Sequence, residues 1–426
     1  MKYFFILGNN PALSIAEILA VLPNFNSYEL INKDVFVLDI DENISGDIIK
    51  RLGGTIKFGR IELESSEKDL LGSMLSMIEL EEIKGKFNFG ISVYGGKIKT
   101  EPLGMEIKKY IKEADKSARY VISREPVLSS VVVETNKLVD GGIEFVLFDK
   151  SPLPLIPPTP FVKGESLKGT DNDTPLTRGA RGVMIARTLS VQPFKELSFR
   201  DYGRPGRDDR SGMLPPKLAQ ILINLASAPL TRGDGGVLLD PFCGSGTILT
   251  EAMLMGFENL IGTDISDRAI RDTKENIKWL KAKFQILNSK FQMFSLSATE
   301  LNKKIEANSI EAIATEPYLG PQRGQVDLKR VVRELEELYT MALLEMYKVL
   351  KPGGRVAMVW PVFKVASRKQ LGVSQCLSPS IGNFKRVEIL PDDLKENMII
   401  KLSERGTIVY GREGQKVWRE IVVLEK

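Results

Sequence analysis

Apolar residues recur with two different periods in the first sixty residues. Short apolar runs at residues 3–7 and 35–38 predict strands, whereas the spacing over residues 14–22 and 44–52 predicts helices. A serine followed three residues later by glutamate opens the first of these helices as a capping box. We therefore expect a small α+β domain over residues 1–57.

A second succession of strand and helix patterns follows. The runs FNFGISVYG, ARYVIS and EFVLF alternate with the helical patterns MEIKKYIKEA and SSVVVETNKL, which predicts another α+β domain over residues 58–150. A cluster of prolines between residues 152 and 160 then indicates a stiff linker. We assign residues 151–198 to this proline-rich linker and the basic segment after it.

The remainder of the chain, residues 199–426, alternates buried strands with helices. The apolar runs VLLD, NLIGTD, FQMFSL, IEAIAT and RVAMVW are separated by helical patterns, an order that predicts a doubly wound, mostly parallel α/β sheet of the Rossmann-like kind. The last strands, in GTIVYGREGQKVWREIVVL, predict a terminal hairpin with GREGQ as its turn.

Composition excludes several kinds of chemistry. The 426 residues include no histidine and only two cysteines, Cys243 and Cys376. Imidazole acid–base catalysis and histidine- or cysteine-ligated metal sites are therefore excluded, and we expect no metal. No apolar run is long enough to cross a bilayer, so we expect no membrane association, and the scarcity of cysteine favours a cytoplasmic location. A net charge of +4 permits a nucleic-acid partner without requiring one.

The stretch VLLDPFCGSGTILTEA carries the strongest chemical signal. Its strand ends at Asp240, and Gly244 and Gly246 permit a tight turn with close backbone approach to a nucleotide. Asp264 ends the next strand, where a ribose is usually bound. Leu249 occupies the third small position of a dinucleotide fingerprint, which weakens a NAD or FAD site. An acidic residue before the glycines favours a cationic ligand such as S-adenosylmethionine (SAM), and a turn without a ligand is the alternative.

Two further segments suggest contacts with a base or with RNA. Glu316, Pro317 and Tyr318 follow the strand IEAIAT, where an acidic group could accept an exocyclic N–H while an aromatic ring stacks on the base. An ordinary turn is the alternative. Arginines and aromatic residues also interleave over residues 178–210, a composition that suits phosphates and unstacked bases; a solvated helix and loop with local Asp–Arg pairs is the alternative. The candidate substrate contacts in this stretch are Arg200, Arg204 and Arg207.

With DPFCGSGT, GTD, the EPY segment and GMLPPKLAQ, the chain resembles SAM-dependent RNA methyltransferases that carry a THUMP domain. Within that group it is most similar to the tRNA guanosine-10 N2-methyltransferases. The resemblance implies a ferredoxin-like unit before the THUMP domain, tRNA as partner and SAM as cofactor, and leaves a small partner subunit open. The SAM-binding positions that it implies are Asp240, Pro241, Phe242, Cys243, Gly244, Gly246, Asp264, Ile265, Ser297 and Ala298.

The chain departs from the family at its fourth motif. The family has Asp-Pro-Pro-Tyr, whereas this chain has Glu316-Pro317-Tyr318-Leu319. Either the loop is reshaped so that Tyr318 stacks on the base, or the target differs from guanine. The leading hypothesis is methylation of guanosine N2 in tRNA, with Glu316, Pro317 and Tyr318 as catalytic residues. Methylation of a DNA-base amine or a protein amide, and a non-catalytic RNA-binding protein, are the alternatives.

Overall fold

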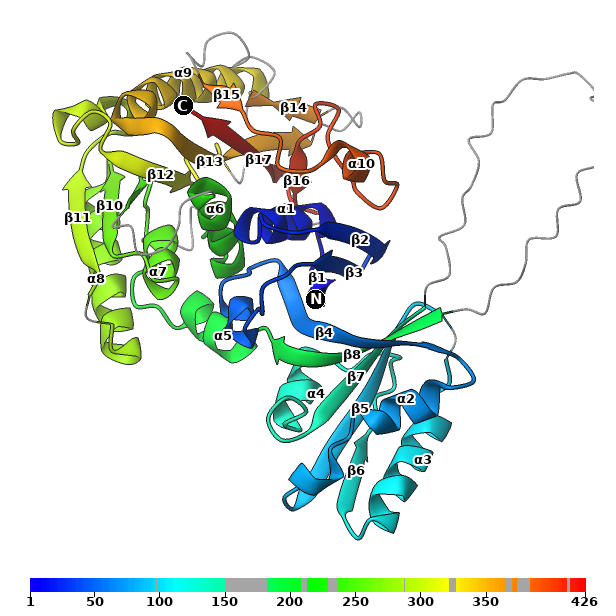
Figure 1. Cartoon of the computed structure of the whole chain (residues 1–426). Coiled ribbons are helices and arrows are strands. Elements are labelled where there is room, and N and C mark those ends of the chain that lie inside the picture. The colour runs from blue at the N-terminus through cyan, green and yellow to red at the C-terminus, as the bar shows by residue number, and fades with distance from the viewer. Residues whose placement is uncertain are drawn as a thin grey trace, which may run out of the picture. The chain divides into compact units, whose positions relative to one another are not determined.

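Strands from distant parts of the chain come together in two compact units. The computed structural model describes residues 1–96, 98–149, 182–207, 213–228, 236–286, 288–321, 327–364, 370–373, 384–411 and 414–426 (Figure 1). Unit 1 comprises Met1–Ile6, Phe25–Gly46 and Ile56–Val191, and unit 2 comprises Leu7–Asn24, Asp47–Thr55 and Gln192–Lys426. The proline cluster predicted as a linker lies outside the described residues.

The first sheet has eight strands within the described residues, in the order β2-β3-β1-β4-β8-β7-β5-β6. The strands are β1 (Lys2–Leu7), β2 (Ser27–Asn32), β3 (Val35–Asp39), β4 (Thr55–Ser66), β5 (Lys86–Tyr94), β6 (Ser117–Val121), β7 (Ile143–Asp149) and β8 (Gly182–Val191). The accompanying helices are α2 (Leu70–Ser76), α3 (Thr100–Glu113) and α4 (Ser130–Thr135).

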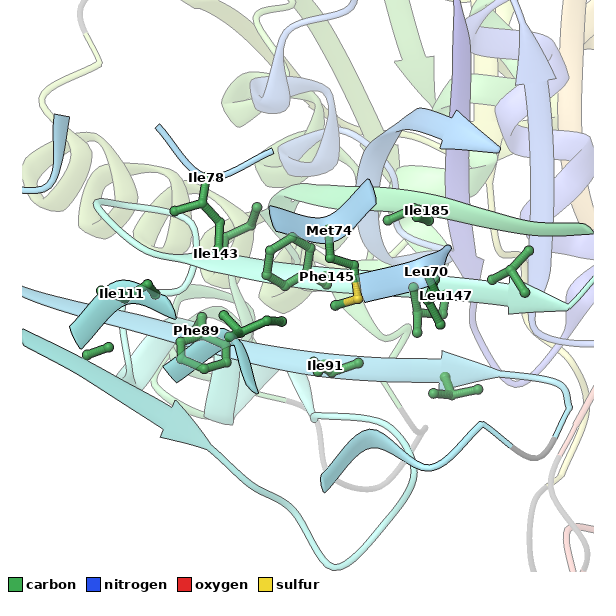
Figure 2. Packing of buried hydrophobic residues seen from close by; sticks show 14 of the residues in the cluster. Leu70, Met74, Ile78, Phe89, Ile91, Ile111, Ile143, Phe145, Leu147 and Ile185 are labelled. Atoms are coloured by element: carbon green, nitrogen blue, oxygen red, sulfur yellow. The ribbon is translucent and has the colours of Figure 1, made fainter. Parts of the chain in front are cut away.

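The core of unit 1 follows from the alternation of apolar residues along its strands. Phe89 and Ile91 of β5 and Phe145 of β7 point to the same face of the sheet, because side chains two positions apart share a face. Met74 of α2 and Ile111 of α3 pack on this face, as Figure 2 shows. Helix and strand patterns that are separate in sequence thereby form one apolar cluster.

The sheet of unit 1 crosses the domain boundaries expected from the sequence. The expected boundary at residue 57 falls inside β4, and β8 lies within the segment expected as a linker. β8 pairs antiparallel with both β4 and β7, so it occupies an interior position. Pairing of strands depends on backbone hydrogen bonds across the sheet, which sequence order does not reveal.

The second sheet confirms the expected α/β arrangement. Its order within the described residues is β11-β10-β9-β12-β13-β17-β15, with β14 paired to β13 and β16 to β17. The strands are β9 (Val237–Asp240), β10 (Asn259–Asp264), β11 (Lys290–Ser295), β12 (Ile310–Thr315), β13 (Leu350–Lys364), β14 (Gln370–Gly372), β15 (Lys385–Arg386), β16 (Ile408–Tyr410) and β17 (Val417–Glu425). The pairs β9–β10, β10–β11, β9–β12 and β12–β13 are parallel, and β16 and β17 form the predicted hairpin.

Helices connect these strands. They are α5 (Phe194–Tyr202), α6 (Pro216–Ser227), α7 (Thr247–Leu254), α8 (Asp267–Phe284), α9 (Leu328–Val349) and α10 (Asp392–Lys395). β10 and β11 lie on one side of β9 and β12 lies on the other, so the order in which successive strands join the sheet reverses beside β9. Ligands of open α/β sheets bind at the carboxyl ends of the strands at such a point. In the described part of the chain, no helix has both the length and the apolar character needed to cross a membrane.

Two N-terminal segments, Leu7–Asn24 and Asp47–Thr55, belong to unit 2. Helix α1 (Pro11–Val21) packs against α6, where Figure 1 also places it. The buried Glu17 carboxylate accepts the backbone N–H groups of Gly53 and Gly54 at 2.9 and 2.8 Å and the Asn224 amide at 2.7 Å. Burial raises the pKa of Glu17 to about 7. The helix predicted over residues 44–52 is only a 3₁₀ helix, Gly46–Lys50, because the chain turns to bring Gly53 and Gly54 to Glu17.

Candidate active site

The turn between β9 and α7 is the tight glycine turn that the sequence predicted. Gly246 has φ +84°, and a Cβ on it would lie 2.6 Å from the Thr273 Cγ2 atom of α8. Gly244 has φ +51°, and a Cβ there would meet no heavy atom of the chain within 4 Å. Gly246 therefore serves the packing of the turn, whereas the space above Gly244 can admit a ligand.

Polar residues of α8 hold this turn in place. The Thr273 hydroxyl donates to the Gly244 carbonyl at 2.7 Å, and the Asn276 amide donates to the Ser245 carbonyl at 2.8 Å. Asn276 also exchanges hydrogen bonds with the backbone of Gly206, whose N–H donates to Oδ1 at 2.8 Å. The sequence interpretation missed both α8 residues. The only signal was that they fall on the apolar face of α8 beside Ile270 and Ile277.

Alanine substitutions at the two glycines should differ in their effects on fold stability and on ligand entry. Gly244→Ala should leave the fold nearly intact, with a cost of about 1 kcal/mol for its left-handed backbone, while obstructing ligand entry. Gly246→Ala should destabilise the fold more, because the added Cβ collides with α8. Thermal unfolding and titration with a nucleoside ligand would check this pair. Equal losses of stability for both variants would contradict the assignment.

Asp240 lies buried at the end of β9. Its Oδ1 accepts the Thr315 hydroxyl at 2.7 Å and the Phe242 N–H at 3.2 Å. Burial raises the pKa of the Asp240 carboxyl to about 7, and the carboxylates of Asp264 and Glu316 contribute to the rise. Thr315 is the last residue of β12, so this hydrogen bond joins the two predicted motifs directly.

Asp264 and the residues after β11 form the other side of the turn. The Asp264 carboxylate accepts the Gly244 N–H at 2.9 Å through Oδ2 and the Ser266 N–H at 2.9 Å through Oδ1. Ile265, next to it, is 80% exposed. Ser297 is the N-cap of the 3₁₀ helix Ala298–Lys303, and the Leu296 N–H donates to the Asp264 carbonyl at 2.9 Å. The chain segments before Ser297 and around Asp264 are thereby adjacent.

Other predicted residues of the turn are largely enclosed. The Cys243 N–H donates to the Thr263 carbonyl at 2.9 Å, and the Pro241 carbonyl accepts the Thr263 hydroxyl at 3.1 Å. Burial raises the pKa of the Cys243 thiol well above its usual range, which keeps it protonated and disfavours a nucleophilic role. These contacts fix the backbone path between Asp240 and Gly244.

The Glu316-Pro317-Tyr318 segment leaves β12 with its side chains in different surroundings. The Glu316 carboxylate pairs with the guanidinium of Arg419 from β17. Tyr318 is 57% exposed, and its carbonyl accepts the hydroxyl of the buried Tyr339 at 2.8 Å. Leu319 is buried. The segment thus presents Tyr318 to solvent and packs Leu319 inside.

The predicted substrate contacts of Arg200 and Arg204 are wrong in this structure, because both side chains are only 5% exposed. Arg200 donates to both carboxylate oxygens of the buried Glu251, at 2.7 and 3.0 Å. Arg204 donates to the Thr247 hydroxyl and to the Arg200 carbonyl. A guanidinium binds a carboxylate in the same bidentate geometry as a phosphate, and the sequence did not reveal Glu251 as the partner.

Arg207 differs from these two arginines. Its guanidinium donates to the Tyr202 carbonyl at 2.8 Å and lies 5.9 Å from the centroid of the Tyr202 ring, which is 70% exposed. It thus remains accessible beside an exposed aromatic ring. Arg178, Arg181 and Arg210 of the basic stretch lie outside the described residues.

Comparison with known proteins finds relatives by sequence and a solved structure with a similar fold. The chain is 33% identical over 174 residues to the tRNA (guanine(10)-N2)-dimethyltransferase of Pyrococcus abyssi, a match covering 41% of this chain and 46% of the relative. It is 28% identical over 169 residues to the enzyme of the same name from Methanocaldococcus jannaschii, covering 37% and 45%. The chain therefore spans about half the length of these curated relatives.

The crystal structure of TrmN from Thermus thermophilus aligns over 100% of both chains with a TM-score of 0.50 and 17% identity, which supports a shared fold. Residues 204–368, which include the glycine turn and the Glu316 segment, match the family described as RMKL-like, methyltransferase domain.

Proposed function

We propose that the chain is a SAM-dependent methyltransferase that modifies N2 of a guanosine in tRNA. The observation that carries this proposal is the open space beside Gly244, whose N–H donates to Asp264, in the turn that follows Asp240. The hydrogen bond from Thr315 to Asp240 joins this turn to the Glu316 segment. These residues lie within the stretch that matches a methyltransferase domain. The identity of the base, its position 10 and the choice of tRNA as substrate are taken from the names of the relatives.

The residues around the turn fit SAM. Asp240, with the backbone from Pro241 to Gly246, would hold the amino-acid end, since a buried carboxylate at this point favours a cation. Asp264 would bind the ribose, next to the exposed Ile265, and Ser297 and Ala298 would contact the adenine. SAM supplies an electrophilic methyl group on its sulfonium.

Glu316 and Tyr318 would assist guanine N2, which is a poor nucleophile. The lone pair of guanine N2 is delocalised into the ring, so acceptance of an N–H hydrogen bond by Glu316 would increase its electron density. Tyr318, held by its carbonyl and exposed at its ring, would stack on the base, and Pro317 would restrict the backbone between them. Extruding the base from its helix costs a few kcal/mol, which such stacking offsets. Arg207 beside Tyr202 would contact the RNA backbone.

The test is transfer of label from methyl-labelled SAM to unmodified tRNA, followed by digestion to nucleosides. Label in N2-methylguanosine or N2,N2-dimethylguanosine supports the proposal. Label in another nucleoside would move the target to a different base, whereas label in DNA or protein would favour the other amine substrates. Detectable RNA binding with no affinity for SAM would favour a non-catalytic role.

Replacement of the predicted acceptor separates chemistry from binding. Glu316→Ala should abolish detectable transfer, because the exocyclic amine loses its acceptor, while the dissociation constant of SAM stays near that of the wild type. Calorimetry with SAM and single-turnover transfer would measure the two effects. Unchanged turnover would remove Glu316 from the reaction.

A further inference from the structure

The Glu316 carboxylate is bound by an arginine from the last strand of the chain, 103 residues away. Arg419 Nε donates to Oε2, and Arg419 Nη2 donates to Oε1 at 3.2 Å, so the pair is bidentate. The two side chains are only 13% and 11% exposed. Water therefore screens this pair much less than it screens a surface ion pair.

The topology explains why arginine is needed at this position. Glu316 follows β12, Arg419 lies on β17, and β13 lies between these two strands. Arg419 is paired with Pro361 of β13, three residues beyond Met358, the partner of Thr315. Adjacent strands are about 4.8 Å apart, so the two side chains must span roughly 10 Å across β13. A long, planar side chain can cover this distance and still bind both carboxylate oxygens.

Pairing with Arg419 leaves Glu316 able to accept a further hydrogen bond. Each carboxylate oxygen has two acceptor positions, and the guanidinium uses one on each oxygen. Without this partner, the flexible glutamate would have other rotamers available, and its electrostatic repulsion with the Asp240 carboxylate would no longer be offset by a nearby positive charge. Arg419 thus restricts the orientation of the Glu316 carboxylate and reduces its electrostatic repulsion with Asp240.

We propose that Arg419 is the positioning residue that orients the Glu316 carboxylate toward the exocyclic amine of the substrate, which makes the C-terminal hairpin part of the methyl-transfer site. This inference rests on the function proposed above. It explains how a glutamate serves where the resembling family has the shorter aspartate: a bidentate partner from β17 fixes the longer side chain.

The test compares Arg419→Gln and Arg419→Lys with Arg405→Lys in the full chain. Arg405 is a matched control, because its guanidinium binds both oxygens of Glu420, the residue after Arg419 on the same strand. A displacement of about 1 Å at the reacting group lowers turnover about a hundredfold, so Arg419→Gln should reduce kcat by that order. The KM for tRNA and the SAM dissociation constant should stay near wild type. Arg419→Lys should give a smaller loss, and Arg405→Lys should retain wild-type kcat.

A double-variant cycle distinguishes positioning from a general structural effect. If Arg419 acts through Glu316, then adding Arg419→Gln to Glu316→Gln should lower kcat no further than Glu316→Gln alone. Additive losses, wild-type kcat in Arg419→Gln, or an equal loss in Arg405→Lys would overturn the inference. Circular dichroism of each variant verifies folding, and Arg419→Lys decides the matter if Arg419→Gln does not fold. A wild-type chain that transfers no methyl group contradicts the proposed function itself.

Discussion

Replacing Arg200 with methionine is expected to lower the free energy of unfolding by roughly 3–5 kcal/mol, because Glu251 would remain buried without its cationic partner. The pair links α5 to α7, the helix that begins immediately after Gly246 of the glycine turn. Gln220 also donates to Glu251 at 3.0 Å, but an amide does not neutralise the charge. Chemical denaturation followed by circular dichroism would measure the loss.

Two further variants make this result specific. Arg207→Met, at an accessible arginine of the same segment, should change the free energy of unfolding by less than about 1 kcal/mol. Arg200→Met combined with Glu251→Leu should recover most of the lost stability, since apolar replacement of a buried pair is often neutral. An Arg200→Met protein as stable as wild type but weaker in tRNA binding would restore the substrate role expected from the sequence.

Asp240→Asn is expected to weaken SAM binding by about ten- to a hundredfold and to stabilise the fold above pH 7. Asn keeps an oxygen that can accept the Thr315 and Phe242 hydrogen bonds, so the change removes mainly the charge. Calorimetric titration with SAM and thermal unfolding from pH 5 to pH 8 would measure both effects. Wild-type SAM affinity in this variant would remove Asp240 from the cofactor site.

The expected pH dependence follows from the raised pKa. The Asp240 carboxyl has a pKa of about 7 in the folded protein against 3.8 as its ordinary value, so the folded state binds the proton more tightly. Its contribution to stability is therefore greatest at low pH and declines as the pH rises from about 4 to about 7. The stability advantage of Asp240→Asn should therefore decrease steadily as the pH falls from about 7 to 5. SAM affinity of the wild type should increase with pH up to about 7, because the cation favours the ionised carboxylate.

The tertiary structure changes the interpretation of the departure from the family motif. The sequence left open whether Tyr318 takes over the stacking position, and the structure exposes Tyr318 while burying Leu319. Gly320, with φ +88°, lies against Val331 and Phe363, where a Cβ would come within 3.1 and 3.2 Å. The backbone after Tyr318 is therefore constrained by packing. A target other than guanine is not required to explain the altered motif.

Local patterns in the sequence determined the parallel strands of the second sheet, the long helices between them and the position of the glycine turn. The runs VLLD and IEAIAT became β9 and β12, the amphipathic pattern before Leu350 became α9, and the final apolar runs became the β16–β17 hairpin. Apolar periodicity and turn residues act over a few positions, so they can be interpreted without knowledge of the fold.

Only the tertiary structure decided which partners the charged residues have. Arg200 pairs with Glu251, Glu316 with Arg419, and Glu17 with the backbone of Gly53 and Gly54. In the sequence, an arginine that binds a buried carboxylate is indistinguishable from one that binds a phosphate, because the same guanidinium geometry serves both. Long-range strand pairing and helix packing set these distances. The sequence thus located the glycine turn, and the fold decided which charged residues pair with each other around it.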